Sequence, residues 1–428
     1  MRREPIRAVE GQPIRVPRDV YDDLAGEGER VAASLGLRIG GVTRLAGTLR
    51  FDNMIGTIAT PRGSIEIAPK TRPGQDWMRS VVDLLDDRPV TIADDVPASS
   101  LGGPSTFRQL LATIFAQRLT RAFGVEGPIT TIEVEHHRSR LLDGHLRVEE
   151  WIQTLFSEPH IFPVERQTVS TDNAFNRTLS HVGRILMADV TDATLRRRLM
   201  NTLKELSEGR DVAEPPTNAT EIHLPDQWGA YLPAWTIAQM ILRRRTTPDA
   251  RARPHGISFA IEPWILLERL LERVVGRLAT AMSGDDAMFT SHSQSGKAFL
   301  SRAVRDHRSR MLFPDCTLVR EGVTIVNFEA KYRDHSITNA PKRSESYQAI
   351  TAGRALGTRL AVLVYPNANE AEVFDILEKG HRPERLATIG LDLFGYRRGQ
   401  EGEFAKSLEA LMQKAGVTCM IDEKELVS

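Results

Sequence analysis

The stretch FPDCTLVREGVTIVNFEAKYRD, residues 313–334, contains two apolar runs separated by the turn-forming pair Glu321-Gly322. The runs predict two strands, Met311–Val319 and Val323–Tyr332, which a tight turn would make antiparallel. Helical spacing of apolar residues predicts a helix before this pair, and a helix, two further strands and a closing helix after it. This order predicts a compact α/β domain. The second strand nevertheless ends in Glu-Ala-Lys, and charged residues are uncommon in a buried strand.

These charged residues are expected to lie near a third one. Side chains alternate along a strand, so Glu329 and Lys331 share a face, and the antiparallel turn lets Asp315 approach Glu329. Two adjacent carboxylates repel each other, and a divalent cation removes that cost. Oxygen ligands favour Mg²⁺, with Mn²⁺ as the alternative. Such an ion polarises a phosphoryl oxygen, and Lys331 could then orient water or stabilise charge on a phosphate. The pattern indicates phosphodiester hydrolysis, with Asp315 and Glu329 as metal ligands and Lys331 as the catalytic lysine.

The same residue types at this spacing also recur by chance in long chains, so a strand that simply reaches solvent is the alternative interpretation. Two more residues are candidates for catalytic roles. Glu268, on the preceding helix, would join the metal shell or would be an exposed member of LLERLLER. Gln348, on the following helix, would position the attacking water or would only cover polar surface. The motif Ser295-Gly296-Lys297 lacks the glycine spacing of a Walker A sequence, so we expect no nucleotide site there, and any GTP would be bound elsewhere.

Composition sets limits on the class of protein. The chain has 428 residues, enough for two or three domains, and no apolar run long enough to span a membrane. Two cysteines and the lack of a signal sequence predict a cytoplasmic protein. Lys and Arg total 56, as do Asp and Glu, so any DNA contact has to be local or shared with another subunit. Local basic clusters, such as residues 302–310, are most simply solvated helix faces.

The order of patterns along the chain predicts three domains. Alternating apolar residues at 36–70, with Pro61-Arg62-Gly63 as a turn, indicate a β-rich domain over residues 1–105. Residues 106–245 carry mainly helical spacing. The polar segment Arg243–Gly256 is the expected boundary, and residues 257–428 form the α/β domain.

The α/β domain is similar to the core of the PD-(D/E)xK nuclease superfamily, and most of the chain resembles the McrC family, the nuclease subunit of McrBC-type restriction systems. The fragments that carry this resemblance occur in the family's order. They are GTIATPRGSIEIAPK with its Ile-x-Pro-Lys-like end at Ile67–Lys70, LLATIFAQRLTRAFGVEGPITTIEVEHHRSRLLDGHL, TVSTDNAFNRTLSHVGRIL, FAIEPWILLERLL, PDCTLV, FEAKYR, YQAI and LVYP. The chain departs from the family where Glu262-Pro263 replaces Asp-Met and where a second aromatic after Gln348 is absent. These departures leave the helix start and the role of Gln348 open.

The resemblance implies that the C-terminal domain cuts DNA and that the N-terminal domain engages a hexameric, McrB-like AAA+ GTPase and stimulates it. Recognition of methylated cytosine in the DNA would lie in that partner. Two alternatives remain open. The chain could be a catalytically silent DNA-binding scaffold and activator of an AAA+ motor, or a stand-alone repair nuclease of the same superfamily.

Overall fold

The computed structural model describes most of the chain as two compact units. One unit comprises Met1–Asp87 and Ala260–Ser428, and the other comprises Arg88–Phe259. The described residues are 4–37, 41–71, 77–85, 107–207, 219, 221–243, 258–284, 287–293, 297–300, 310–334, 340–367, 370–377 and 382–417. The expected boundary at Arg243–Gly256 and the basic cluster at 302–310 fall almost wholly outside these residues, so the three domain limits stay predictions.

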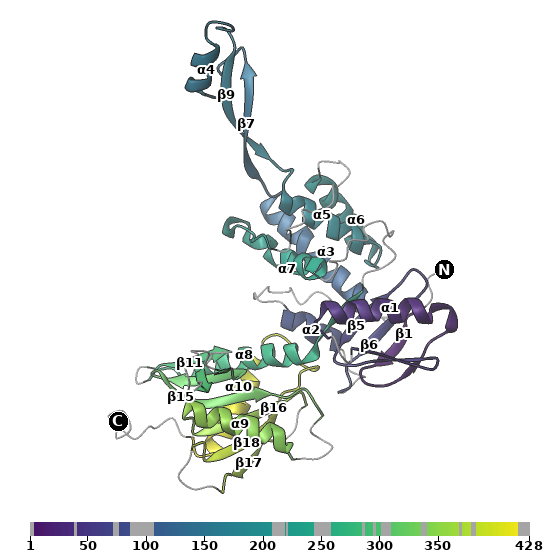
Figure 1. The fold of residues 1–428 in the computed structure, drawn as a ribbon, viewed down its shortest axis with the longest axis vertical. Coiled ribbons are helices and arrows are strands. Elements are labelled where there is room, and N and C mark those ends of the chain that lie inside the picture. Colours follow the sequence, from purple (N-terminus) through teal and green to yellow (C-terminus); the bar gives the residue numbers. More distant parts are fainter. Residues whose placement is uncertain are drawn as a thin grey trace. The chain divides into compact units, whose positions relative to one another are not determined.

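In the N-terminal part of the first unit, the described residues form two small sheets and two helices. Its elements are β1 (Ile6–Val9), β2 (Ile14–Arg15), α1 (Arg18–Ser34), β3 (Val42–Leu45), β4 (Thr48–Phe51), β5 (Ile55–Ala59), β6 (Ser64–Ala68) and α2 (Trp77–Leu85). One sheet has the order β1-β6-β5-β10, in which β10 is Phe259–Ile261, and the other has the order β2-β4-β3. All of β5 is buried, and Figure 1 shows α1 beside these strands. The β-rich prediction for residues 36–70 is confirmed, and β1 and α1 extend it.

A six-stranded mixed sheet forms the C-terminal part of the same unit. Its order is β11-β14-β15-β16-β18-β17. These strands are β11 (Phe289–Ser293), β14 (Cys316–Arg320), β15 (Val323–Ala330), β16 (Leu360–Tyr365), β17 (Glu372–Asp375) and β18 (Arg385–Gly390). β14 and β15 are antiparallel, whereas β15, β16 and β18 run parallel. The mixed α/β fold class is therefore confirmed.

The hairpin between β14 and β15 has the turn that its sequence predicts. Glu321 has φ of 50° and Gly322 has φ of 83°, the pair of positive values typical of a tight two-residue hairpin turn. The first predicted strand, Met311–Val319, is wrong in its extent. The chain forms β13 (Arg310–Leu312), which pairs with β12 (Lys297–Leu300), and leaves strand geometry before β14 begins. Pro314 explains the break because it cannot donate a ladder hydrogen bond.

Within the residues that the structure describes, three helices cover this sheet. They are α8 (Pro263–Met282), α9 (Arg343–Leu356) and α10 (Glu401–Lys414). α9 packs on β15 and β16, while α8 and α10 pack against each other. Every residue of β16 is buried, so both faces of the central sheet are covered. Pro263 occupies the first turn of α8, where its missing N–H costs nothing, so the Glu262-Pro263 departure from the family pattern is compatible with a normal helix start.

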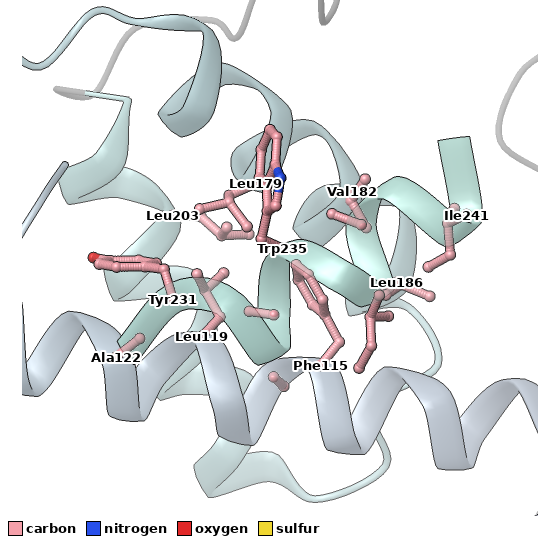
Figure 2. Packing of buried hydrophobic residues seen from close by; sticks show 14 of the residues in the cluster. Phe115, Leu119, Ala122, Leu179, Val182, Leu186, Leu203, Tyr231, Trp235 and Ile241 are labelled. Carbon is pink, nitrogen blue, oxygen red and sulfur yellow. The ribbon is translucent and has the colours of Figure 1, made fainter. Parts of the chain in front are cut away.

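The second unit has its own core between helices. Its helices are α3 (Phe107–Glu126), α4 (Val148–Thr154), α5 (Ala174–Met187), α6 (Ala193–Leu206), the 3-10 helix Asp226–Tyr231 and α7 (Leu232–Arg243). Figure 2 shows Trp235 and Leu179 among the side chains that fill the space above α3, and both are almost fully buried. Asn173 caps α5 by accepting a hydrogen bond from the Asn176 amide at 2.9 Å. The mainly helical spacing of residues 106–245 is confirmed by α3, α5, α6 and α7.

An antiparallel arm extends from these helices (Figure 1). It pairs β7 (Thr131–Ser139) with β9 (Phe162–Ser170), adds the short β8 (His145–Leu146), and carries α4 between them. Most of β7 is exposed. The arm was not predicted from the sequence, because Pro163 and Val164 are the only buried residues of β7 and β9, so burial imposes little pattern on these strands. No helix in the described part of the chain is both long and apolar enough to cross a bilayer.

Candidate active site

The end of β15 brings the three predicted charged residues together. Oδ2 of Asp315 accepts a hydrogen bond from the Ala330 amide at 2.7 Å, so Asp315 is held beside the residue that follows Glu329. Glu329 is 4% exposed. Burial, followed by the charge of Asp315, raises the pKa of Glu329, and burial likewise raises the pKa of Asp315. The two carboxylates therefore lie close together, as the sequence predicts.

Lys331 is held by two partners on the same side of the strand. Its Nζ donates to Oε1 of Glu329 at 2.8 Å and to Oε1 of Gln348 at 3.0 Å. Gln348 lies on α9, and its Nε2 donates in turn to Glu329. Glu329, Lys331 and Gln348 therefore form a closed hydrogen-bonded triangle that fixes the ammonium group. The structure therefore places Gln348 beside Glu329 and Lys331, although the residue is exposed, and its part in positioning water stays a prediction.

Glu268 faces the same group of charges from α8. Burial raises its pKa to about 7, with further contributions from the negative charges of Asp315, Glu272 and Glu329. Glu272 lies one turn further along α8, and the spacing of four residues places it on the same helix face as Glu268. Near neutral pH, Glu268 is thus poised to hold or release a proton close to the two other carboxylates.

The raised pKa of Glu268 predicts a pH-dependent stability of the metal-free protein. A carboxyl group with a folded-state pKa near 7, against about 4.5 when unfolded, stabilises the fold at low pH and loses that contribution as pH rises through this window. We expect Glu268→Gln to raise the free energy of unfolding at pH 8 by about 1 kcal/mol, allowing for the partial exposure of the group. At pH 4.5 the substitution should have little effect.

Urea unfolding in EDTA at both pH values measures this difference, with Glu403→Gln as the matched control because Glu403 is exposed on α10. An equal effect of the two substitutions at pH 8 would show that Glu268 is not perturbed by its neighbours.

Buried polar groups beneath the triangle hold α9 in place. Asn327, two residues before Glu329 and fully buried, donates to the Ala349 carbonyl at 3.0 Å and accepts from the Thr358 hydroxyl at 2.8 Å. Because Asn327, Glu329 and Lys331 all contact α9 or the turn that follows it, the predicted alternation along β15 is confirmed. At the N-terminal turn of α9, Arg333 forms an ion pair with Glu345 at 2.8 Å. Sequence patterns gave no sign of these contacts, which join segments that are distant along the chain.

The donor set fits a hard cation of the Mg²⁺ type. Asp315 and Glu329 supply oxygen ligands only, and such an ion commonly binds through one or two carboxylates and keeps several waters. Among the described residues, no three His, Cys, Asp or Glu side chains converge to form a complete protein cage. In this structure the cationic group on Glu329 is the ammonium of Lys331. The two carboxylates are therefore compatible with a metal whose remaining ligands are water and substrate.

The other histidines and cysteines that the structure describes do not suggest a second metal site. His136 and His137 are neighbours on β7 and pair with different carboxylates, Glu165 at 3.9 Å and Asp143 at 3.3 Å. Cys316 is free and buried, and burial raises the pKa of its thiol to about 12. Such a thiol is a poor nucleophile and a poor metal ligand at neutral pH.

Comparison with known proteins places this site in a family context. The family described as "McrBC 5-methylcytosine restriction system component" matches residues 49–366. A chain of the refined half-complex from the tetradecameric assembly of Thermococcus gammatolerans McrB AAA+ hexamers with bound McrC is similar in structure. Its TM-score is 0.68 at 15% identity, and the match covers 95% of the present chain and 100% of that chain. A chain of the Thermococcus gammatolerans McrBC complex has a TM-score of 0.50 at 18% identity, with 64% of the present chain and 88% of that chain covered. Curated proteins gave no match. At these identities the structural likenesses establish the fold alone.

Proposed function

The chain belongs to the family of McrBC 5-methylcytosine restriction system components, and we propose that it is the nuclease subunit of such a system. In this proposal it is a Mg²⁺-dependent DNA endonuclease of the PD-(D/E)xK type that works with, and stimulates, a McrB-like hexameric AAA+ GTPase. The observation that carries the proposal is the geometry at the end of β15. There, the half-buried carboxylate of Asp315 and the buried carboxylate of Glu329 lie beside Lys331, whose ammonium group is held by Glu329 and Gln348.

Each residue of the site has a distinct task in phosphodiester hydrolysis. A bound Mg²⁺ supplies Lewis-acid polarisation of a phosphoryl oxygen. Asp315 and Glu329 would hold this ion, and the hydrogen bond from Ala330 to Asp315 fixes the direction of one carboxylate in advance. Lys331 places a positive charge where negative charge develops on the phosphate. Gln348 keeps the ammonium in position and offers an amide group to orient water. Glu268, with a pKa of about 7, can accept or donate a proton at the edge of the site.

We further propose that the β7–β9 arm contacts the AAA+ partner. Large apolar side chains gather near the tip of the arm and have no cover in the described part of the chain. They are Leu141, Leu142, Val148, Ile152 and Phe156, with exposures of 73%, 60%, 53%, 57% and 98%. Apolar side chains grouped in this way mark protein interaction sites. One structurally similar chain comes from an assembly of McrB AAA+ hexamers with bound McrC, which makes a protein of that class the favoured occupant. Contact through residues 1–105, expected from the sequence, remains a separate prediction.

Replacing Phe156 and Ile152 together by serine should weaken partner binding by about 100-fold, because buried apolar anchors dominate interface energies. The isolated chain should keep its thermal stability, since both side chains are exposed in it. Size-exclusion chromatography and titration of binding to the McrB-like protein would measure the effect. Ile132→Ser is the matched control, because Ile132 is 68% exposed but lies at the other end of β7. Equal binding by the wild type, the double serine variant and Ile132→Ser would rule out the arm tip as the contact with the partner.

Reconstitution tests the complete proposal. The chain, the McrB-like GTPase of the same organism, GTP and Mg²⁺ are mixed with methylated or unmethylated plasmid, and cleavage and GTP turnover are measured in the same samples. We expect cleavage only of methylated DNA with both proteins and Mg²⁺ present. Stimulated GTP turnover without cleavage would favour the scaffold alternative. Metal-dependent cleavage by the chain alone, with no effect on GTP turnover, would favour the stand-alone nuclease.

A further inference from the structure

A contact distant in sequence joins the N-terminal strands to the residue that follows the candidate catalytic lysine. The Tyr332 hydroxyl donates to Oε2 of Glu10 at 2.8 Å, across 322 residues of sequence. The Lys70 ammonium lies 3.5 Å from Oε1 of Glu10 and 4.7 Å from the centre of the Tyr332 ring. All three residues belong to the same compact unit. We refer to Glu10, Lys70 and Tyr332 as the latch.

Both N-terminal members of the latch are held by their own backbone. Glu10 directly follows β1, and its amide donates to the Ala68 carbonyl at 2.8 Å, at the end of β6. Lys70 lies two residues further on, and its amide is within 3.5 Å of Oε2 of Glu10. The pairing of β1 with β6 therefore sets the distance between the carboxylate and the ammonium. Lys70 is also the last residue of the Ile-x-Pro-Lys-like segment, whose conformation this arrangement explains.

The burial of the Glu10 carboxylate and the Tyr332 hydroxyl costs free energy of desolvation, which apolar side chains at the same positions would not cost. Glu10 is 2% exposed, and burial raises its pKa despite the opposing effect of Lys70. Burial and the nearby Glu10 also raise the pKa of Tyr332 well above its usual value, so the phenol remains a neutral hydrogen-bond donor. A buried charged group adds little net stability and is often better explained by the specific geometry that it enforces. The latch is therefore suited to fixing a position.

The position that it fixes is the backbone from which Lys331 projects. Neighbouring side chains on an extended chain point in opposite directions, so Tyr332 reaches Glu10 while Lys331 reaches α9. The Lys331 amide donates to the Val364 carbonyl of β16 at 2.8 Å. The Tyr332 ring also packs edge-on against Phe394, with centroids 6.2 Å apart. The backbone at Lys331 and Tyr332 is thus held by the sheet through the Lys331 amide and by the N-terminal strands through the Tyr332 side chain.

We infer that Glu10, Lys70 and Tyr332 are positioning residues for the nuclease reaction, through which the N-terminal strands hold Lys331 in its productive place. The inference rests on the proposed nuclease function. It assigns a role to the N-terminal part of the first unit that is separate from partner binding. Displacements of about 1 Å at a catalytic group can lower a rate about 100-fold. Loss of the latch should therefore lower the rate of cleavage rather than DNA affinity.

The test uses the full reconstituted complex with Tyr332→Phe, Glu10→Gln and the double variant. Each single variant should lower kcat for cleavage by about 10- to 100-fold with KM for DNA and GTP turnover unchanged. The double variant should be no worse than the poorer single variant, because the residues act as a unit. Glu29→Gln is the matched control, since Glu29 forms an exposed ion pair with Arg44 in the same region. Thermal unfolding of every variant shows whether the fold is kept.

Hydrogen exchange provides a measurement that does not depend on activity. Amides of residues 329–333 should exchange faster in Tyr332→Phe and Glu10→Gln than in wild type, while those of β16 stay protected. Unchanged exchange in this segment with wild-type kcat would overturn the inference, as would a general loss of protection and thermal stability that accounts for the fall in activity. A third outcome is that the wild-type complex does not cleave DNA while residues 329–333 exchange faster in the two variants. In that case the nuclease proposal fails, but the inference that the latch holds the backbone at Lys331 stands.

Discussion

Lys331→Ala should reduce DNA cleavage by the reconstituted complex by about 10²- to 10⁴-fold, which is the usual effect of losing a catalytic acid, base or charge-stabilising group. The ammonium is the positively charged group within hydrogen-bond distance of Glu329, and it is already oriented by Gln348. Its removal takes away positive charge at the place where a phosphate would develop negative charge. GTP turnover by the partner should remain stimulated, because the arm proposed to contact it belongs to the other compact unit.

Lys406→Ala is the control for this substitution, since Lys406 is an exposed lysine on α10 of the same unit. Cleavage of methylated plasmid and GTP hydrolysis are followed in one reaction mixture. Loss of cleavage with intact GTP turnover would establish that the chain is both nuclease and activator. If the alanine variant cuts as fast as wild type, the ammonium has only a structural role and the proposed chemistry is wrong.

The candidate site could be assembled from the sequence because its signals are local. A turn pair, Glu321-Gly322, and strict alternation along a short strand place Glu329 and Lys331 on one face and bring Asp315 close. The helix that carries Gln348 is the next element of the chain, and the crossover between the parallel strands β15 and β16 lays it on the sheet. The contacts of the candidate site therefore span 15 to 19 residues of sequence and lie within one hairpin and the helix that follows it.

Other features depend on partners that no local pattern reveals. The latch joins Glu10 to Tyr332, and the strand β10 adds to a sheet whose other members lie near the N-terminus. Neither contact leaves a periodic signal in the sequence. The arm was missed for the opposite reason. Phe156 lies outside the strands of the arm and faces solvent in the isolated chain, so no burial pattern in the sequence marks it.

Asp315→Asn should abolish metal-dependent cleavage, with a fall of at least about 10²- to 10³-fold, and should weaken Mn²⁺ binding in parallel. The asparagine keeps a side-chain oxygen that can accept the hydrogen bond from Ala330, now 2.7 Å long, so the local structure should survive. Only the charge is lost. Asp375→Asn is the matched control, because Asp375 is an aspartate of the same sheet that is 76% exposed.

Asp315→Asn should lower activity but stabilise the metal-free protein. This combination distinguishes a metal ligand from an aspartate that serves the fold, whose loss would destabilise the protein. Burial raises the pKa of Asp315, so its charge opposes folding at neutral pH, and removing the charge should increase the free energy of unfolding in EDTA at pH 8. Mn²⁺ titration followed by electron paramagnetic resonance measures binding, and urea unfolding measures stability. Unchanged Mn²⁺ affinity would exclude Asp315 as a ligand. A less stable variant would mean that the carboxylate serves the fold. A more stable variant that no longer binds metal is the result expected of a site that gives up stability for function.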